Sequence, residues 1–218
     1  RQRQMCIRDS TSSTYYIPSS LKSVTITGGN ILYGAFYNCS GLTNITIPAS
    51  VTSIGNYAFY GFSSLTEIRY NGDLAGWLNI SGLDNLMKYG ESAKALYIDG
   101  TKIEGDLVIP DSVTSIGSYA FYWCRGLTSV TIPDSVTSIG GSAFYNCSGL
   151  TSVIIGSGVT SIGEGAFSGC SSLTEITLPF VGASAKTESN CTGTSWGACS
   201  PRPISCSSFP LKASSRWA

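Results

Sequence analysis

The stretch Leu127-Thr-Ser-Val-Thr-Ile-Pro-Asp-Ser-Val-Thr-Ser-Ile-Gly-Gly-Ser-Ala-Phe-Tyr-Asn-Cys-Ser-Gly149 decides the fold, because near-copies of it recur along the 218-residue chain. An Ala-Phe pair recurs at a constant spacing in two stretches of the chain. The phenylalanines of the first stretch are Phe36 and Phe59, and those of the second are Phe121, Phe144 and Phe167. Shortly after the ring the chain carries Cys39, Cys124, Cys147 or Cys170, and once Phe62. A fixed period of this kind is typical of stacked repeat architectures.

Each repeat is predicted to form one coil of a solenoid. Its first half has an L-x-x-L-x-L pattern that alternates inward and outward as a strand, and Pro133 ends that strand by removing a backbone donor. The Ala-Phe-x-x-Cys segment suits a short helical turn on the convex side. The predicted interior positions of one coil are Leu127, Val130, Ile132, Val136, Ile139, Ala143, Phe144 and Cys147. Stacked coils bury a column that no single coil can bury alone, so we expect a mostly β, right-handed leucine-rich-repeat solenoid.

The pattern L-T-x-V-T-I-P-x-x-V-T-S-I-G-x-x-A-F-x-x-C-S resembles the BspA-like leucine-rich repeat family, over residues 19–70 and 107–179. The resemblance implies a secreted or surface-attached protein, typically of bacteria or parasitic protists. Such a protein binds components of host or neighbouring cells, and the resemblance implies no catalysis.

A block without the repeat separates two predicted repeat regions, 11–70 and 107–179. The interval from Phe59 to Phe121 exceeds one period by more than another whole repeat, so we assign residues 71–106 to an insertion. Asp99-Gly100 predicts a two-residue hairpin, and Asp73 predicts the N-cap of a short helix that buries Trp77. This block also resembles an insertion seen in members of the same family. Its alternative role is a cap over one coil edge.

Both ends of the chain lack the repeat. Codons for Gln4-Met-Cys-Ile-Arg-Asp-Ser10 can spell a transposase mosaic end used in sequencing libraries, so we interpret residues 1–10 as a disordered adapter translation. Residues 180–218 form an irregular tail, and synonymous codons of 209–218 in another frame can encode a repeat. We therefore expect a frameshift near residue 186, with a genuine disordered or disulfide-bearing tail as the alternative.

Composition and motifs argue against several function classes. Thirteen basic and thirteen acidic residues give no net charge, so no nucleic-acid partner is expected. The chain contains no histidine and no P-loop, dinucleotide or nucleophile-elbow motif, so we expect no catalytic residue and no cofactor. No apolar run approaches the ~20 residues of a membrane span.

The cysteines give no metal-binding pattern. A slot that accepts Phe62 in place of cysteine needs an apolar filler, which predicts buried free thiols at the four repeat positions. Disulfides between neighbouring coils are the less favoured alternative. Cys191, Cys199 and Cys206 have a spacing that matches no zinc signature.

Two repetitive surfaces are candidates for partner binding. The outward strand positions form a concave strip, whose residues are Ser23, Thr25, Asn44, Thr46, Glu67, Arg69, Ser129, Thr131, Ser152, Ile154, Glu175 and Thr177. The second surface is an aromatic row made of Tyr37, Tyr60, Tyr122 and Tyr145. Each surface has an alternative explanation. The strip residues can be present only because they favour a half-exposed β-strand, and the tyrosine rings can pack against one another along the coil edge.

The insertion carries the most varied side chains, because it concentrates aromatic residues and lysines, the groups that anchor interfaces. Its candidates are Trp77, Lys88, Tyr89, Lys94, Tyr97 and Lys102. We hypothesise that residues 71–106 set partner specificity while the solenoid supplies reach. The predicted partner-binding residues are Trp77, Tyr89, Tyr97, Lys102, Thr46, Glu67, Arg69, Thr131, Glu175 and Thr177.

Together these features predict a monomeric, non-catalytic repeat protein, extracellular or at the cell surface. Its expected partner is a protein or glycan on a host or neighbouring cell. The alternatives are a structural spacer within a larger surface protein and the non-catalytic part of an extracellular enzyme.

Overall fold

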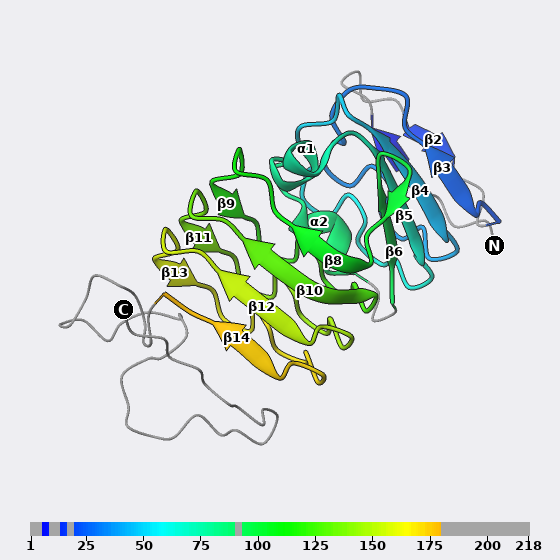
Figure 1. Ribbon diagram of the computed structural model, residues 1–218. Helices are drawn as coiled ribbons and strands as arrows, with labels where there is room; N and C mark the ends of the chain where they lie inside the picture. Colours follow the sequence, from blue (N-terminus) through cyan, green and yellow to red (C-terminus); the bar gives the residue numbers. More distant parts are fainter. Residues whose placement is uncertain (1–5, 9–13, 17–19, 90–92, 180–218) are drawn as a thin grey trace. The chain divides into compact units, whose positions relative to one another are not determined.

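The computed structural model describes residues 6–8, 14–16, 20–89 and 93–179 (Figure 1). The chain divides into two compact units, residues 1–103 and 104–218, and each is described by itself. Within the described residues both units are built from stacked coils with very little helix, which confirms the predicted β-solenoid.

Unit 1 contains a five-stranded sheet in the order β3-β4-β5-β6-β7. Its strands are β3 (Ser23–Thr25), β4 (Asn44–Pro48), β5 (Glu67–Asn71), β6 (Ala95–Ile98) and β7 (Thr101–Lys102). The first four pair in parallel, as successive coils require, whereas β6 and β7 pair antiparallel around Asp99-Gly100. Asp99 and Gly100 both have positive φ angles, 47° and 74°, so the predicted hairpin is confirmed.

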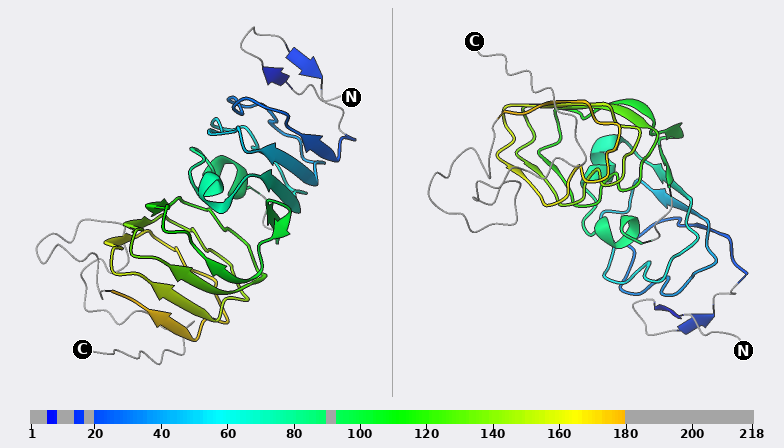
Figure 2. Two further views of the ribbon diagram at one scale, coloured as in Figure 1. Left: turned by 45° about the horizontal axis from the view of Figure 1, so that its top comes forward. Right: turned by 90° about the horizontal axis from the view of Figure 1, so that it is seen from below.

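Unit 2 contains two parallel sheets, and Figure 2 shows its coils lying one upon the next. The first sheet has the order β8-β10-β12-β14, with bounds β8 (Gly105–Val108), β10 (Leu127–Ile132), β12 (Ser152–Ile155) and β14 (Glu175–Thr177). The second has the order β9-β11-β13, with bounds β9 (Ser115–Ile116), β11 (Ser138–Ile139) and β13 (Ser161–Ile162). Val130 lies opposite Val153 and Ile139 opposite Ile162, so these strands are offset by one repeat, whereas the β8–β10 pairing has a register shift between Leu127 and Ser129.

The predicted interior positions are buried. Leu127, Val136, Ala143, Phe144 and Cys147 are fully inaccessible, and β10 ends at Ile132 directly before Pro133. The Phe144 ring stacks between two others, with centroids 5.1 Å from Phe121 and 5.2 Å from Phe167. A continuous aromatic column therefore runs through the coils of unit 2.

The predicted short helical turn after Ile-Gly is wrong in its backbone. The segment is a series of tight turns in which alternate amides bond back within the coil, such as Tyr145 N–H to Ser142 O and Cys147 N–H to Phe144 O. The intervening amides point to the next coil, as Phe144 N–H does to Ala166 O at 2.8 Å. Positive φ angles at Ser142 and Asn146 produce this alternation. A helix would bond all these amides within the coil and leave the neighbouring coil unpaired.

Threonine hydroxyls form a second set of hydrogen bonds between coils, which the sequence pattern did not reveal. Thr151 and Thr174 each donate to the carbonyl of the threonine one repeat earlier, at 2.8 and 3.2 Å. Thr137 and Thr160 repeat this contact on the other side of the coil, at 3.0 and 3.2 Å. These hydrogen bonds explain why threonine follows both Leu and Val in the repeat.

Residues 71–98 complete a coil of unit 1 instead of standing apart from it. β5 and β6 pair directly, with Glu67 opposite Ala95, whereas Asn44 lies opposite Glu67 one coil earlier, so this coil is slightly longer than its neighbour. This coil contains α1 (Leu74–Leu78) and α2 (Asp84–Met87), which lie beside the strands (Figure 1). Asp73 caps α1 by accepting from Gly76 N–H at 2.7 Å, and Trp77 is fully buried, as predicted.

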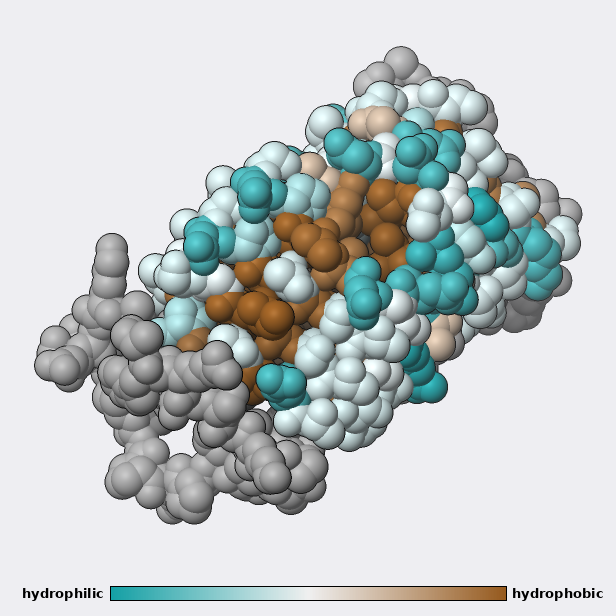
Figure 3. All heavy atoms as spheres, in the orientation of Figure 1, coloured by the Kyte–Doolittle hydropathy of each residue, from teal (hydrophilic) through white to brown (hydrophobic). Residues whose placement is uncertain are grey.

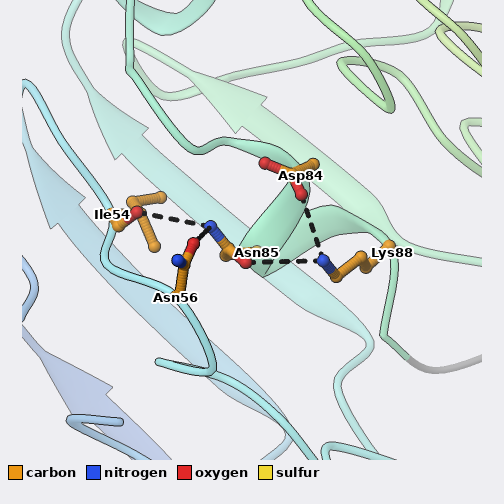
Figure 4. Close-up of polar contacts among 5 residues, drawn as sticks. All are labelled: Ile54, Asn56, Asp84, Asn85 and Lys88. Atoms are coloured by element: carbon orange, nitrogen blue, oxygen red, sulfur yellow. Dashed lines mark hydrogen bonds and ion pairs between the residues drawn. The ribbon is translucent and has the colours of Figure 1, made fainter. Parts of the chain in front are cut away.

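The second helix is fixed to the preceding coil by a buried amide. Asn85, 5% exposed, donates to Ile54 O and to Asn56 Oδ1, both at 3.4 Å (Figure 4). Its own amide oxygen accepts from Lys88 Nζ at 3.4 Å, and Lys88 also pairs with Asp84 at 3.1 Å. A buried polar group with partners on both sides selects one position for α2 on the coil.

The expectations for the chain ends fall mostly outside the described residues. Within 1–10, the structure describes β1 (Cys6–Arg8), which pairs antiparallel with β2 (Thr14–Tyr16). The expectations for the other residues of 1–10 and for the tail from 180 to 218 lie outside the described part.

Candidate binding surface on the strand face

The strand face of unit 1 brings together five of the predicted partner-binding residues. In β5, Ile68 and Tyr70 point inward and are at most 2% exposed, so Glu67 and Arg69 alternate to the outer face. Arg69 lies opposite Thr46 on one side and Tyr97 on the other, and Tyr97 lies opposite Lys102. We call this group the unit 1 strip: Thr46, Glu67, Arg69, Tyr97 and Lys102.

Contacts within the unit 1 strip hold Arg69 in place. Its Nε donates to Glu67 Oε1 at 2.6 Å, and its guanidinium carbon lies 4.1 Å from the centre of the Tyr97 ring. Hydrogen bonding by Arg69, with a smaller contribution from Asn44, lowers the pKa of Glu67. The carboxylate is therefore charged at neutral pH. Arg69, Glu67 and Tyr97 together present a cation, an anion and an aromatic ring in contact with one another.

The strand face of unit 2 has different chemistry. Its two columns, read across the register, are Asp106, Ser129, Ser152 and Glu175, and Val108, Thr131, Ile154 and Thr177. Val108 is 66% exposed and Ile154 52%, and Figure 3 shows hydrophobic residues gathered over β10 and β12. Asp106 accepts from Ser129 Oγ at 2.6 Å, which lowers its pKa. The predicted residues Thr131, Glu175 and Thr177 thus belong to a separate surface from the unit 1 strip.

Val108 was not among the predicted residues although the sequence contained a signal for it. Asp106-Leu-Val-Ile-Pro110 follows the Ser-Val-Thr-Ile-Pro register of the next coil with valine in the threonine slot. That alignment places Val108 beside Thr131, where the structure has it.

Two predictions for the insertion are corrected by burial. Trp77 is fully inaccessible because α1 turns it into the core against Tyr70, with ring centroids 5.7 Å apart, so it cannot contact a partner. Lys94 is 4% exposed and does not belong to the surface. Tyr89 is half-buried and meets the edge of the Tyr60 ring at 5.6 Å, so it extends the tyrosine row instead of the unit 1 strip.

The four repeat cysteines are buried free thiols, as predicted. Desolvation raises the pKa of Cys39 and Cys170 to about 12, and raises that of Cys147 well above its ordinary value. The Cys147 and Cys170 Sγ atoms each donate to a phenylalanine carbonyl at 3.2 Å. A thiol that remains protonated at neutral pH fills space and supplies no thiolate nucleophile or metal ligand.

Within the part of the chain that the structure describes, no three histidine, cysteine, aspartate or glutamate side chains are placed to share a metal ion. The same residues include no helix that is both long and apolar enough to cross a bilayer.

A repeat of this length, with this register and these buried slots, defines a leucine-rich repeat solenoid. The chain belongs to the BspA type leucine rich repeat region family, whose model matches residues 9–76 and 98–191 in six copies. The matched residues include most strands of both units and the first part of the helical coil.

Several solved bacterial leucine-rich repeat proteins are similar to this chain. A T. pallidum leucine rich repeat protein is 26% identical over 75% of this chain and 61% of its own, with a TM-score of 0.32. A leucine rich cell surface protein from Faecalibacterium prausnitzii A2-165 is 25% identical over 72% and 59%, with a TM-score of 0.34. A Bacteroides ovatus leucine-rich repeat protein is 28% identical over 76% and 36%, with a TM-score of 0.34.

The chain therefore spans less than two thirds of the length of each of these three proteins. No curated protein matches it.

Proposed function

We propose that this protein is a non-catalytic binding protein that attaches to a protein partner on another cell through the unit 1 strip. The observation that carries the proposal is the arrangement of Arg69, which is paired with Glu67 and lies over the Tyr97 ring. The hairpin of β6 and β7 contributes Tyr97 and Lys102, so the predicted insertion and the strand face form one surface.

The physical support comes from the kind and order of these side chains. Tyrosine and arginine are over-represented among residues that dominate binding free energy. Arg69 is 43% exposed although two neighbours restrain it, so a partner has less side-chain entropy to remove on binding. The columns of hydroxyl side chains elsewhere on the strand faces offer weaker and more repetitive contacts.

A location outside the cell fits the same proposal. Membership of the BspA type family accords with a surface or secreted site, and the F. prausnitzii protein is itself described as a cell surface protein. We propose that the unit 1 strip acts there in adhesion to host or neighbouring cells, and that the protein acts as a monomer.

Two other roles make different predictions. A structural spacer would tolerate any polar substitution on the unit 1 strip without loss of attachment. A non-catalytic part of an extracellular enzyme would attach to the substrate of a neighbouring domain. The ordered ion pair and its stacked ring favour the binding role, because a spacer has no use for a restrained, exposed arginine.

Replacing Arg69 with alanine is expected to weaken attachment of the purified chain to cultured epithelial cells by about tenfold or more, as for a central interface arginine. Attachment is measured by flow cytometry with a fluorescently labelled protein. Arg69→Lys is expected to restore little, because an ammonium group does not reproduce the contact of the guanidinium with the Tyr97 ring. Ser152→Ala, on the unit 2 face, is the matched control and should bind as the parent does.

Equal attachment of Arg69→Ala and the parent would refute the role of the unit 1 strip. Treating the cells with protease before the assay distinguishes a protein partner from a glycan partner. A protein partner predicts loss of attachment after protease, whereas attachment that survives protease and falls after glycosidase treatment would assign a glycan instead.

A further inference from the structure

A contiguous patch of tyrosines lies on the turn edge of unit 1, away from the unit 1 strip. Among the described residues seven large hydrophobic side chains are exposed, and five of them belong to this edge: Leu32, Tyr33, Tyr37, Tyr57 and Tyr60. The rings form a chain of contacts, with centroid distances of 5.7 Å for Tyr33–Tyr57, 5.9 Å for Tyr57–Tyr60, 5.0 Å for Tyr37–Tyr60 and 5.6 Å for Tyr60–Tyr89. We call Tyr33, Tyr37, Tyr57, Tyr60 and Tyr89 the tyrosine patch.

The backbone at Tyr57 has a conformation that is unusual for a bulky residue. Tyr57 has a φ of 58°, in the left-handed region that bulky side chains avoid. The same slot of other coils holds Gly34 at 64° and Gly165 at 64°, for which this conformation has no steric cost, and also Tyr119 at 62° and Ser142 at 55°. Tyr57 therefore keeps a strained backbone although 47% of it is exposed and it does not fill the core.

The charge of the tyrosine patch indicates what it binds. The phenol groups carry no formal charge, and the nearby Lys88, 5.3 Å from the Tyr89 ring, is paired with Asp84. The patch therefore suits a neutral ligand that has both apolar faces and hydroxyl groups.

We propose that the tyrosine patch binds a neutral oligosaccharide. A sugar ring presents a C–H face that packs on an aromatic ring and hydroxyls that bond to phenol oxygens. Tyr33 and Tyr57 meet at 73°, which forms a corner where one sugar can rest on one ring beside the edge of the other. Tyr37 and Tyr60 stack on each other along the coils, with centroids 5.0 Å apart and an interplanar angle of 14°, and so extend the aromatic surface beside this corner.

This site stands apart from the proposed protein-binding site, because its rings lie on the turn edge whereas Arg69 and Tyr97 lie on the strand face. The two sites can therefore be tested independently. Loss of sugar binding would leave the unit 1 strip intact, and loss of attachment through Arg69 would leave the tyrosine patch intact.

The test is a titration of the full chain with cellohexaose, chitohexaose, maltohexaose and mannohexaose, followed by saturation-transfer NMR and calorimetry. At least one hexasaccharide is expected to bind with a millimolar or lower Kd. Tyr57→Gly is expected to weaken that binding by about tenfold or more while keeping the melting temperature at or above that of the parent, because glycine relieves the positive φ. Tyr33→Ala tests the other side of the corner, and Arg69→Ala should bind the sugar as the parent does.

Absence of binding to all four probes at millimolar concentration would overturn the proposal, as would unchanged affinity in both Tyr57→Gly and Tyr33→Ala. Sedimentation velocity tests another occupant. Concentration-dependent dimers that disappear in Tyr57→Gly would assign the tyrosine patch to a second copy of the chain and also overturn the proposal.

Discussion

Replacing Phe144 with alanine is expected to lower the free energy of unfolding by about 3–5 kcal/mol, the usual cost of truncating a fully buried aromatic ring. Phe144 has no accessible surface and stacks between Phe121 and Phe167. The adjacent coils cannot close the gap, because their spacing is fixed by the β-sheet hydrogen bonds on both sides of the ring. Thermal and urea unfolding followed by circular dichroism measure the loss.

Tyr145→Ala is the matched control, since it removes a neighbouring ring from the outer side of the same turn. Tyr145 is half-buried and stacks on Tyr122 at 5.1 Å, which agrees with the alternative of ring packing along the coil edge. We expect a cost of about 1 kcal/mol or less for this ring. Equal losses for the two variants would contradict the assignment of inner and outer positions.

Replacing Gly140 with alanine is expected to destabilise unit 2 by roughly 2–3 kcal/mol, through overpacking against backbone. A Cβ on Gly140 would lie 2.4 Å from Ser118 N and 2.7 Å from the carbonyl carbon of Gly117 in the preceding coil. Main-chain atoms cannot rotate away as a side chain can, so either the two coils separate or the turn changes. The measurement is the midpoint of urea unfolding at a constant slope.

Gly117→Ala is the matched control for this variant, because it occupies the same Ile-Gly slot one coil earlier. A Cβ there meets nothing within 4 Å, so we expect a change within about 0.5 kcal/mol. If Gly117→Ala destabilised the protein as much as Gly140→Ala, the glycine would be required by its own conformation and not by the close approach of coils.

The coil interior was predictable because burial there follows a periodic pattern. Leu127, Val130 and Ile132 alternate along a strand, and the structure buries each of them to 1% exposure or less. The turn after Ile-Gly was not predictable from the same pattern. Its apolar spacing fits a helix, but left-handed residues such as Ser142 and Asn146 interrupt the backbone, so that alternate amides reach the next coil. Hydrogen bonding between coils decides this conformation, and a single repeat does not show it.

The candidate site was predicted in its residue types and only partly in its location. Glu67 and Arg69 follow from strand alternation, and Tyr97 joins them because the hairpin continues the same sheet. Trp77 and Tyr89 were misplaced because a tryptophan or tyrosine in a short helical block has no period that separates an inner from an outer face. The tyrosine patch depends on ring contacts between coils, which need the register and the turn conformation together.

The most direct test of the central claim, that a protein partner binds across the unit 1 strip, is site-specific photocrosslinking on cells. A benzophenone amino acid replaces Thr46, which lies opposite Arg69, and in a second variant replaces Ile154 on the unit 2 face. Illumination of bound protein, followed by denaturing gels and mass spectrometry, is expected to give a defined adduct with one cellular protein from position 46 and none from position 154. Adducts from position 154 alone, or none from position 46 while the protein remains attached, would contradict the claim.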